Sequence, residues 1–160
     1  MTDDQAPSLP TEVNMLLDPR GPRFAAVVTT LVLVVVLLTG SGWLALAQAV
    51  VFAIAAVDPR RSPYGLLFRA VVAPRLARPA ELEPVAPVRF AQLLGLGFML
   101  VAAAGYLSGA TWLGLVVSCL ALAAAFLNGA FGLCLGCETY LAFRRMTGRA
   151  IPARVPNPSN

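Results

Sequence analysis

The fold is decided by residues 112–140, which read WLGLVVSCLALAAAFLNGAFGLCLGCETY. The first two-thirds of this stretch are uncharged and apolar enough to form a helix that crosses a lipid bilayer. The apolar run then ends in two cysteines, Cys134 and Cys137, and Glu138 follows directly. The stretch therefore predicts a transmembrane helix that delivers a Cys-x-x-Cys motif to the membrane surface.

The composition of the whole chain agrees with an integral membrane protein. Of its 160 residues 58% are hydrophobic and 12% are charged, whereas soluble domains carry about 25% charged residues. All 12 basic residues are arginine, and the sequence contains no histidine. The missing imidazole removes the commonest general base and the commonest metal ligand. We therefore expect one membrane domain without a separate soluble catalytic unit.

Four apolar blocks divide the chain into two pairs of predicted transmembrane helices. The first pair covers residues 24–39 and 43–57, and the second pair covers residues 90–107 and 112–133. Within each pair a short uncharged turn separates the two blocks, so each pair is expected to form a helical hairpin. The sequence thus predicts an all-α membrane protein, with four transmembrane helices as two hairpins within residues 18–147.

The two hairpins begin with the same three residue types, Arg23-Phe24-Ala25 and Arg89-Phe90-Ala91. Each triplet is followed by an apolar run, a small turn, a tryptophan and a second apolar run. Both hairpins would then enter the membrane from the same side, as in a parallel internal repeat. Two similar hairpins of independent origin would give the same pattern, so both interpretations stay open.

Charged and proline-rich segments lie outside the apolar blocks. Residues 1–17 are acidic and lack the basic start of a signal peptide, so we interpret them as a flexible tail, and residues 148–160 as a C-terminal tail. The central segment, residues 58–89, is rich in arginine and proline. Within it, residues 64–73 are apolar but too short to span a bilayer. They predict an interfacial helix in the headgroup plane, with a loop packed on the bundle as the alternative.

The distribution of arginine predicts the orientation in the membrane. The turns at residues 39–42 and 108–111 carry no charge, whereas every arginine lies in the opening, central or C-terminal segment. Four spans place these three segments on one side, which the positive-inside rule assigns to the cytoplasm. We therefore expect a multi-pass protein of the plasma membrane with both termini in the cytoplasm. The lipid bilayer, and not nucleic acid, is the expected partner of the arginines.

Cys134 and Cys137 form the candidate redox pair. A helix that starts at Trp112 rises about 33 Å before it reaches them, so they are predicted to emerge at the cytoplasmic rim. Their spacing suits thiol–disulfide exchange, in which one thiolate attacks and the other resolves the mixed disulfide. The alternatives are a purely structural pair and half of a metal site that a second chain completes. We expect no cofactor, and no metal bound within one chain.

Other polar residues near the pair are candidates for binding. Arg144 and Arg145 would favour a thiolate, whereas Glu138 would oppose it. Asn128 lies within the last predicted span, where a polar group either serves function or forms a hydrogen bond between helices. Cys119 lies about 22 Å up the same predicted helix, too far to share a disulfide or a metal with the pair. We interpret Cys119 as a buried apolar packing residue.

Four stretches together resemble the bacterial membrane family known as domain of unknown function 4395. They are DPRGPRFAA at the first span, SPYGLLFR in the centre, PVRFAQLLG at the third span and AAFLNGAFGLCLGCETY at the end. The resemblance covers about residues 18–145, and its most specific part is FGLCLGCETY. It implies a small multi-span membrane protein whose relatives keep company with thioredoxin-like or rhodanese-like proteins, and it supplies no mechanism.

Three functions are compatible with these features. The first is a membrane-held thiol–disulfide or sulfur-relay module, in which Cys134 and Cys137 react with a soluble thioredoxin-like or rhodanese-like partner. The second is a non-catalytic scaffold subunit of a larger membrane complex, in which the cysteines are silent. The third is a small transporter built as a homo-oligomer, although the predicted spans carry no ionisable residue to couple transport to protons. Whether the protein is an enzyme stays open on these grounds.

Overall fold

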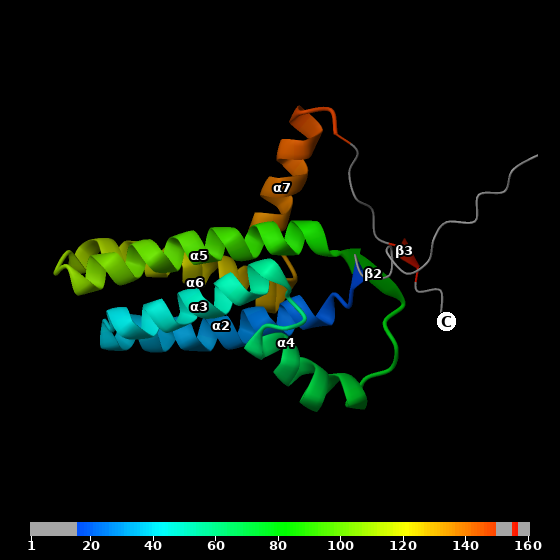
Figure 1. The fold of residues 1–160 in the computed structure, drawn as a ribbon, viewed down its shortest axis with the longest axis horizontal. Coiled ribbons are helices and arrows are strands. Elements are labelled where there is room, and N and C mark those ends of the chain that lie inside the picture. The colour runs from blue at the N-terminus through cyan, green and yellow to red at the C-terminus, as the bar shows by residue number, and fades with distance from the viewer. Residues whose placement is uncertain (1–15, 150–154, 157–160) are drawn as a thin grey trace, which may run out of the picture.

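The computed structural model describes residues 16–149 and 155–156, and the chain is mostly helical (Figure 1). In chain order the elements are β1 (Leu16–Leu17), α2 (Arg20–Thr39), α3 (Gly42–Val57), α4 (Pro63–Leu67), the π-helical turn η1 (Phe68–Val72), the 3-10 turn η2 (Ala73–Arg75), β2 (Glu81–Pro84), α5 (Val85–Leu107), α6 (Thr111–Phe131), α7 (Leu135–Met146) and β3 (Val155–Pro156). The all-α class is confirmed. Helices α2, α5 and α6 are long and apolar enough to cross a membrane, while α3, also apolar, has 16 residues.

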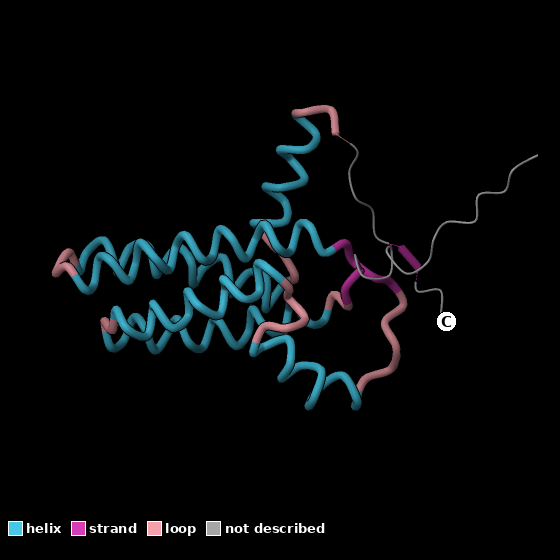
Figure 2. The backbone as a smooth tube through the Cα atoms, in the orientation of Figure 1, coloured by secondary structure: helices cyan, strands magenta, loops and turns pink. Residues whose placement is uncertain are grey.

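Helices α2, α3, α5 and α6 lie side by side as one bundle (Figure 1), and the turns α2–α3 and α5–α6 lie at the same end of it. The most extensive packing joins α3 to α5 and α2 to α6. The first helix of each pair therefore packs on the second helix of the other pair. At the opposite end the backbone trace shows the strands, α4 and α7 leaving the bundle (Figure 2).

The bundle has small side chains inside and large apolar side chains outside. Its core combines Leu33, Val36 and Met99 with five alanines from α3, α5 and α6, namely Ala45, Ala49, Ala102, Ala103 and Ala121. On the outer surface Trp43 and Trp112 are 72% and 70% exposed, one beside each turn. Small residues let helices approach closely, and an apolar outer surface needs lipid around it. This distribution supports the membrane class that the composition predicted.

A small sheet joins three distant segments at the charged end. β2 lies between β1 and β3 and is antiparallel to both, with Leu17 opposite Glu83 and Leu82 opposite Val155. The acidic composition of residues 1–17 predicts a flexible tail, whereas the structure places Leu16 and Leu17 in β1. Pairing of such short strands depends on a partner more than 60 residues away, which local sequence does not reveal. Residues 1–15 of that predicted tail lie outside the described residues.

The apolar piece of the central segment is helical, as predicted. Ser62 caps α4 by accepting a hydrogen bond from the Gly65 amide at 3.0 Å, and η1 and η2 extend the helix to Arg75. Phe68 is buried against Phe24 of α2, with ring centroids 5.8 Å apart. The segment is thus a helix and not a loop, and it packs on the bundle; its place in the headgroup plane stays a prediction.

The last long helix ends earlier than predicted. α6 stops at Phe131, and Gly132 terminates it in the left-handed conformation with φ of 71°. After a short loop the chain starts α7, which projects sideways from the bundle (Figure 1). The prediction of one helix running to residue 133 and on to Cys134 is therefore wrong. The apolar run continues through the break, so hydropathy hid it, whereas the glycine is a common helix stop.

Candidate functional site

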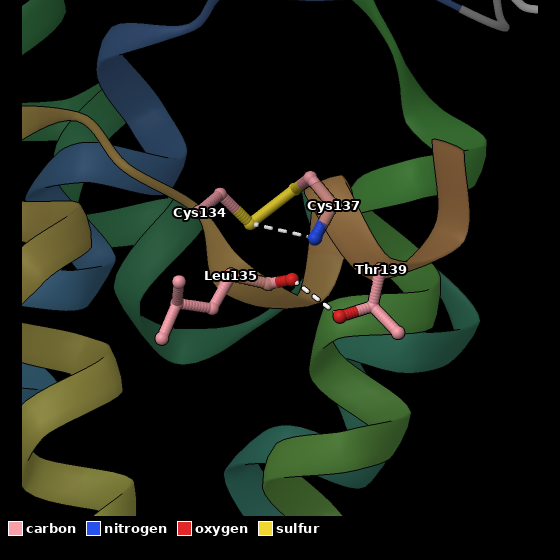
Figure 3. The surroundings of a disulfide bond; sticks show 4 residues. All are labelled: Cys134, Leu135, Cys137 and Thr139. Carbon is pink, nitrogen blue, oxygen red and sulfur yellow. Dashed lines mark hydrogen bonds between the residues drawn. A yellow bond between two sulfur atoms is a disulfide. The ribbon is translucent and has the colours of Figure 1, made fainter. Parts of the chain in front are cut away.

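The structure joins the predicted pair, Cys134 and Cys137, in a disulfide across the first turn of α7 (Figure 3). Their Cα atoms are 5.2 Å apart. Cys134 is the N-cap residue of α7, and its Sγ accepts a hydrogen bond from the Cys137 amide at 3.2 Å. The two cysteines are therefore held at the start of a 12-residue helix, which is the position where a thiolate is best stabilised.

Glu138 lies in the same first turn and opposes a negative charge on sulfur. It is exposed, and its amide donates to the Cys134 carbonyl oxygen at 3.0 Å as part of the helix. Its carboxylate is favoured by the helix N-terminus in the same way as a thiolate would be. The helix amides, and not the predicted arginines, thus oppose Glu138 by favouring a thiolate at Cys134.

Gly136 lets the disulfide turn lie directly on α5. A Cβ atom at this position would come within 2.7 Å of the Ala91 Cα and Cβ atoms. One turn further along α7, the Tyr140 ring packs against Phe90, with centroids 5.5 Å apart. Ala91 and Phe90 belong to the second Arg-Phe-Ala triplet. The first two turns of α7, which contain the Cys-x-x-Cys motif, therefore pack on this triplet. The sequence alone did not suggest this role.

Arg144 and Arg145 lie in the last turn of α7, away from the cysteines. The rise from Cys134 to Arg144 is about 15 Å along the helix. The Arg144 Nη1 atom donates to the Tyr140 hydroxyl at 2.8 Å, and its guanidinium lies 5.7 Å from that ring's centroid. Arg144 therefore braces Tyr140, and neither arginine is placed to stabilise a cysteine thiolate.

Arg23 is the basic residue that the structure brings close to the cysteine loop. Its guanidinium lies against Gly132, where any added Cβ would collide with it. The matching arginine of the second triplet, Arg89, donates from Nε to the Ala56 carbonyl oxygen at 2.7 Å, at the end of α3. Sequence reasoning missed the role of Arg23. The internal repeat was the available signal, because both arginines lie at the end of the other pair's second helix.

A cavity of about 720 Å³ opens beside the disulfide, between α2, α3, α4, α5 and α6. Asn128, a predicted binding residue, lines it together with Gln92 and Cys134, whereas Cys137 is not among its lining residues in the described part of the chain. Tyr64 closes one side and donates its hydroxyl to Gln48 Oε1 at 2.6 Å. Burial raises the pKa of Tyr64, which keeps this hydroxyl protonated. The central segment thus folds over the same cavity that Cys134 reaches.

Comparison with known proteins confirms the resemblance seen in the sequence. Residues 17–145 match the family described as Domain of unknown function (DUF4395). The chain belongs to the DUF4395 family. No curated protein and no solved structure matches it.

The third cysteine of this DUF4395 protein, Cys119, lies on the outside of α6. It is a free thiol, exposed in a shallow groove that Thr30 of α2 also lines. The interpretation of Cys119 as a buried packing residue is therefore wrong. Its neighbour Ser118 takes the fully buried position instead. In a helix that is apolar on all sides, hydropathy does not tell which of two adjacent residues faces the core.

The described residues include no group of three or more His, Cys, Asp or Glu side chains that could hold a metal ion. A metal at Cys134 and Cys137 would need the reduced thiolates and ligands from another chain. The disulfide form offers no thiolate.

Proposed function

We propose that this DUF4395 protein is a membrane-held thiol–disulfide module with Cys134 and Cys137 as its reactive pair. The observation that supports this most is the disulfide across the first turn of α7, with Cys134 Sγ at the helix N-terminus. A bond in this position is easy to open, because the leaving Cys134 thiolate keeps its hydrogen bond from the Cys137 amide and gains from the helix dipole.

The exchange follows from the different surroundings of the two sulfurs. A thiolate of a thioredoxin-like partner attacks Cys137, the cysteine that does not line the cavity, and Cys134 leaves as a thiolate. The second thiol of the partner then attacks the mixed disulfide and releases Cys137. The partner ends as a disulfide and this protein as a dithiol, so two electrons have moved to the membrane protein. A rhodanese-like partner that carries a persulfide would instead pass its outer sulfur atom to the Cys134 thiolate of the reduced pair, and the partner's own cysteine would leave as a thiolate.

The proposed topology has four spans and places both termini and the central segment in the cytoplasm. It rests on the three helices of membrane length and on α3, whose 16 residues rise about 24 Å. In the described residues all charges lie in segments that meet at the end opposite the two turns (Figure 1). The positive-inside rule then orients the protein in the plasma membrane.

Labelling with a thiol reagent that does not cross membranes tests this orientation in intact cells. We expect Cys134 and Cys137, after reduction, to be protected until the cells are opened. A single cysteine introduced at Ser41, in the turn between α2 and α3, is the matched control and should be labelled from outside. Strong labelling of the reduced pair from outside would overturn the cytoplasmic placement.

Trapping tests the exchange itself. In the Cys134→Ser variant the remaining Cys137 thiolate should displace a small leaving thiol from a thioredoxin-like protein whose first cysteine carries that thiol as a disulfide and whose second cysteine is replaced by serine. The mixed disulfide that forms should be stable, because neither protein then holds a second thiol that resolves it. Cys119→Ser should leave both the exchange and the trapping of the Cys134→Ser background unchanged. Absence of any mixed disulfide, with a wild-type pair that thioredoxin-like proteins do not reduce, would contradict the proposal. The scaffold and transporter alternatives predict instead that the double variant Cys134→Ser/Cys137→Ser keeps full function in cells.

A further inference from the structure

The cavity beside the disulfide has the size and the lining of a small-molecule site. Its volume of about 720 Å³ lies within the range of roughly 300–1,000 Å³ that is usual for such sites. Further from the charged end its walls are aromatic and aliphatic, from Phe52, Leu94, Phe98 and Leu120. A ligand that fills this part must be apolar over most of its length.

Polar groups are gathered at the end of the cavity that Cys134 reaches. Gln92 lies near the start of α5 and Asn128 in the last turn of α6, and both line the cavity. Neither amide side chain has a hydrogen-bond partner among the described residues, although both side chains are half-buried. Amide N–H groups that line a cavity and have no protein partner can donate to the carbonyl oxygens of a ligand.

We propose that this cavity binds a lipid-soluble quinone, which takes the electrons that the Cys134–Cys137 pair collects. The quinone ring lies between Cys134 and the amides of Gln92 and Asn128, and its alkyl tail lies along Phe52 and Phe98. This inference rests on the proposed thiol–disulfide function and names the electron acceptor for it. The structure also assigns the two sulfurs, with Cys137 facing the protein partner and Cys134 facing the quinone.

The proposed step balances in electrons and protons. The two S–H bonds of the reduced pair break and one sulfur–sulfur bond forms, which releases two electrons and two protons. The quinone takes both, its two carbonyl oxygens become hydroxyls, and it leaves as a quinol into the bilayer. The disulfide is then ready for the next partner. A phospholipid chain would suit the apolar part of the cavity, but it gives no role to the amides or to Cys134.

The test uses the full-length protein, reduced and placed in nanodiscs of synthetic, quinone-free phospholipid. The probe is a benzoquinone with four ring substituents, one of them a ten-carbon tail, because full substitution prevents a thiol from adding to the ring. Loss of quinone absorbance and formation of the Cys134–Cys137 bond are followed together. We expect one quinone to be consumed for each disulfide formed, and no reaction in the Cys134→Ser variant.

Two neighbouring alanines of α6 give a matched pair of variants. Ala124 lines the cavity, whereas Ala123 lies on the outer surface in the groove beside Cys119. Ala124→Phe should fill the cavity and slow quinone reduction at least about tenfold, whereas Ala123→Phe should leave the rate unchanged. Asn128→Leu, a smaller change, should weaken the quinone's apparent affinity about tenfold. All variants should still exchange disulfides with a thioredoxin-like protein, which serves as the check on folding.

The outcomes separate this inference from the function on which it rests. If the reduced protein exchanges disulfides with a thioredoxin-like protein but does not reduce the quinone, the quinone site is overturned and the thiol module stands. If it does neither, both proposals fail. Equal rates in Ala124→Phe and Ala123→Phe would also overturn the site, since the reaction would then occur outside the cavity. Purification with a bound phospholipid that the quinone does not displace would have the same meaning.

Discussion

The two halves of the chain build the same local structure twice, and only the second half contains sulfur at the decisive position. In the first half Ser62 caps α4 and accepts from the Gly65 amide at 3.0 Å. In the second half Cys134 caps α7 and accepts from the Cys137 amide at 3.2 Å. In both cases the donor lies three residues after the cap. The comparison teaches that the disulfide-bonded cysteines occupy an ordinary helix cap and the position whose amide donates to that cap.

The aromatic contacts repeat as well. Six residues after its cap, α4 is followed by Phe68, which packs on Phe24 at 5.8 Å, while α7 presents Tyr140, which packs on Phe90 at 5.5 Å. Phe24 and Phe90 are the central residues of the two Arg-Phe-Ala triplets. The sequence left a duplication and independent hairpins both open, and these matching contacts favour a parallel duplication. Chemistry would then have been added to one copy of a structural motif.

Replacing the cysteine cap of the second half by the serine cap of the first half gives the largest expected effect. Cys134→Ser recreates in the second half the cap of the first half, so we expect α7 to form but disulfide exchange to fall more than about 100-fold, because no bond between the two positions remains. Ser62→Ala should leave exchange unchanged. Gel-shift assays with a thioredoxin-like protein measure both. Wild-type exchange in Cys134→Ser would show that the cap position is not the reactive one.

Gly136→Ala should give the next largest effect. The added methyl collides with the Ala91 backbone, so α7 has to shift on α5, which is expected to destabilise the protein by about 1–3 kcal/mol and to slow exchange several-fold. Gly97→Ala in α5 is the matched control, since an added Cβ there has no neighbour within 4 Å. Thermal unfolding in detergent measures the stability. Equal behaviour of the two variants would mean that α7 does not rest on α5.

Replacing the phenylalanine of each Arg-Phe-Ala triplet by leucine tests whether the two halves have different roles. Phe24→Leu and Phe90→Leu each remove a ring pair and are expected to lower stability by about 0.5–1.5 kcal/mol. Only Phe90→Leu should also change the rate of disulfide exchange, by a few-fold, because Phe90 supports Tyr140 on α7. Unfolding curves and exchange rates of both variants provide the readout. A comparable loss of exchange in Phe24→Leu would argue against separate roles for the two halves.

The smallest expected effect is that of the hydroxyl cap. Ser62→Ala removes the acceptor for the Gly65 amide and is expected to destabilise the protein by about 1 kcal/mol. Ser62→Thr keeps a hydroxyl and should retain most of the stability. The unfolding midpoint in detergent measures this difference. If Ser62→Ala were as stable as the wild type, α4 would depend on Phe68 and not on its cap.

Much of the architecture was predictable because each helix that crosses the apolar bilayer must itself be a continuous run of apolar residues. Four apolar blocks, two uncharged turns and a charged end are visible from residue types alone, and the bundle follows them to within a few residues. The spacing of Cys134 and Cys137 was likewise enough to predict that the two residues act as a pair. The sequence did not predict α7, because the apolar run hides the break at Gly132.

By itself, then, the sequence determined the membrane class, the helical pattern and the pairing of Cys134 with Cys137, since hydropathy and spacing are local properties. Only the tertiary structure decided that Ser118 and not Cys119 faces the core, that Arg23 and not Arg144 lies by the cysteine loop, and that Cys134 lines a cavity. Helices that are apolar on every side carry no signal for which face packs inward. That choice is made by contacts between segments far apart in the chain.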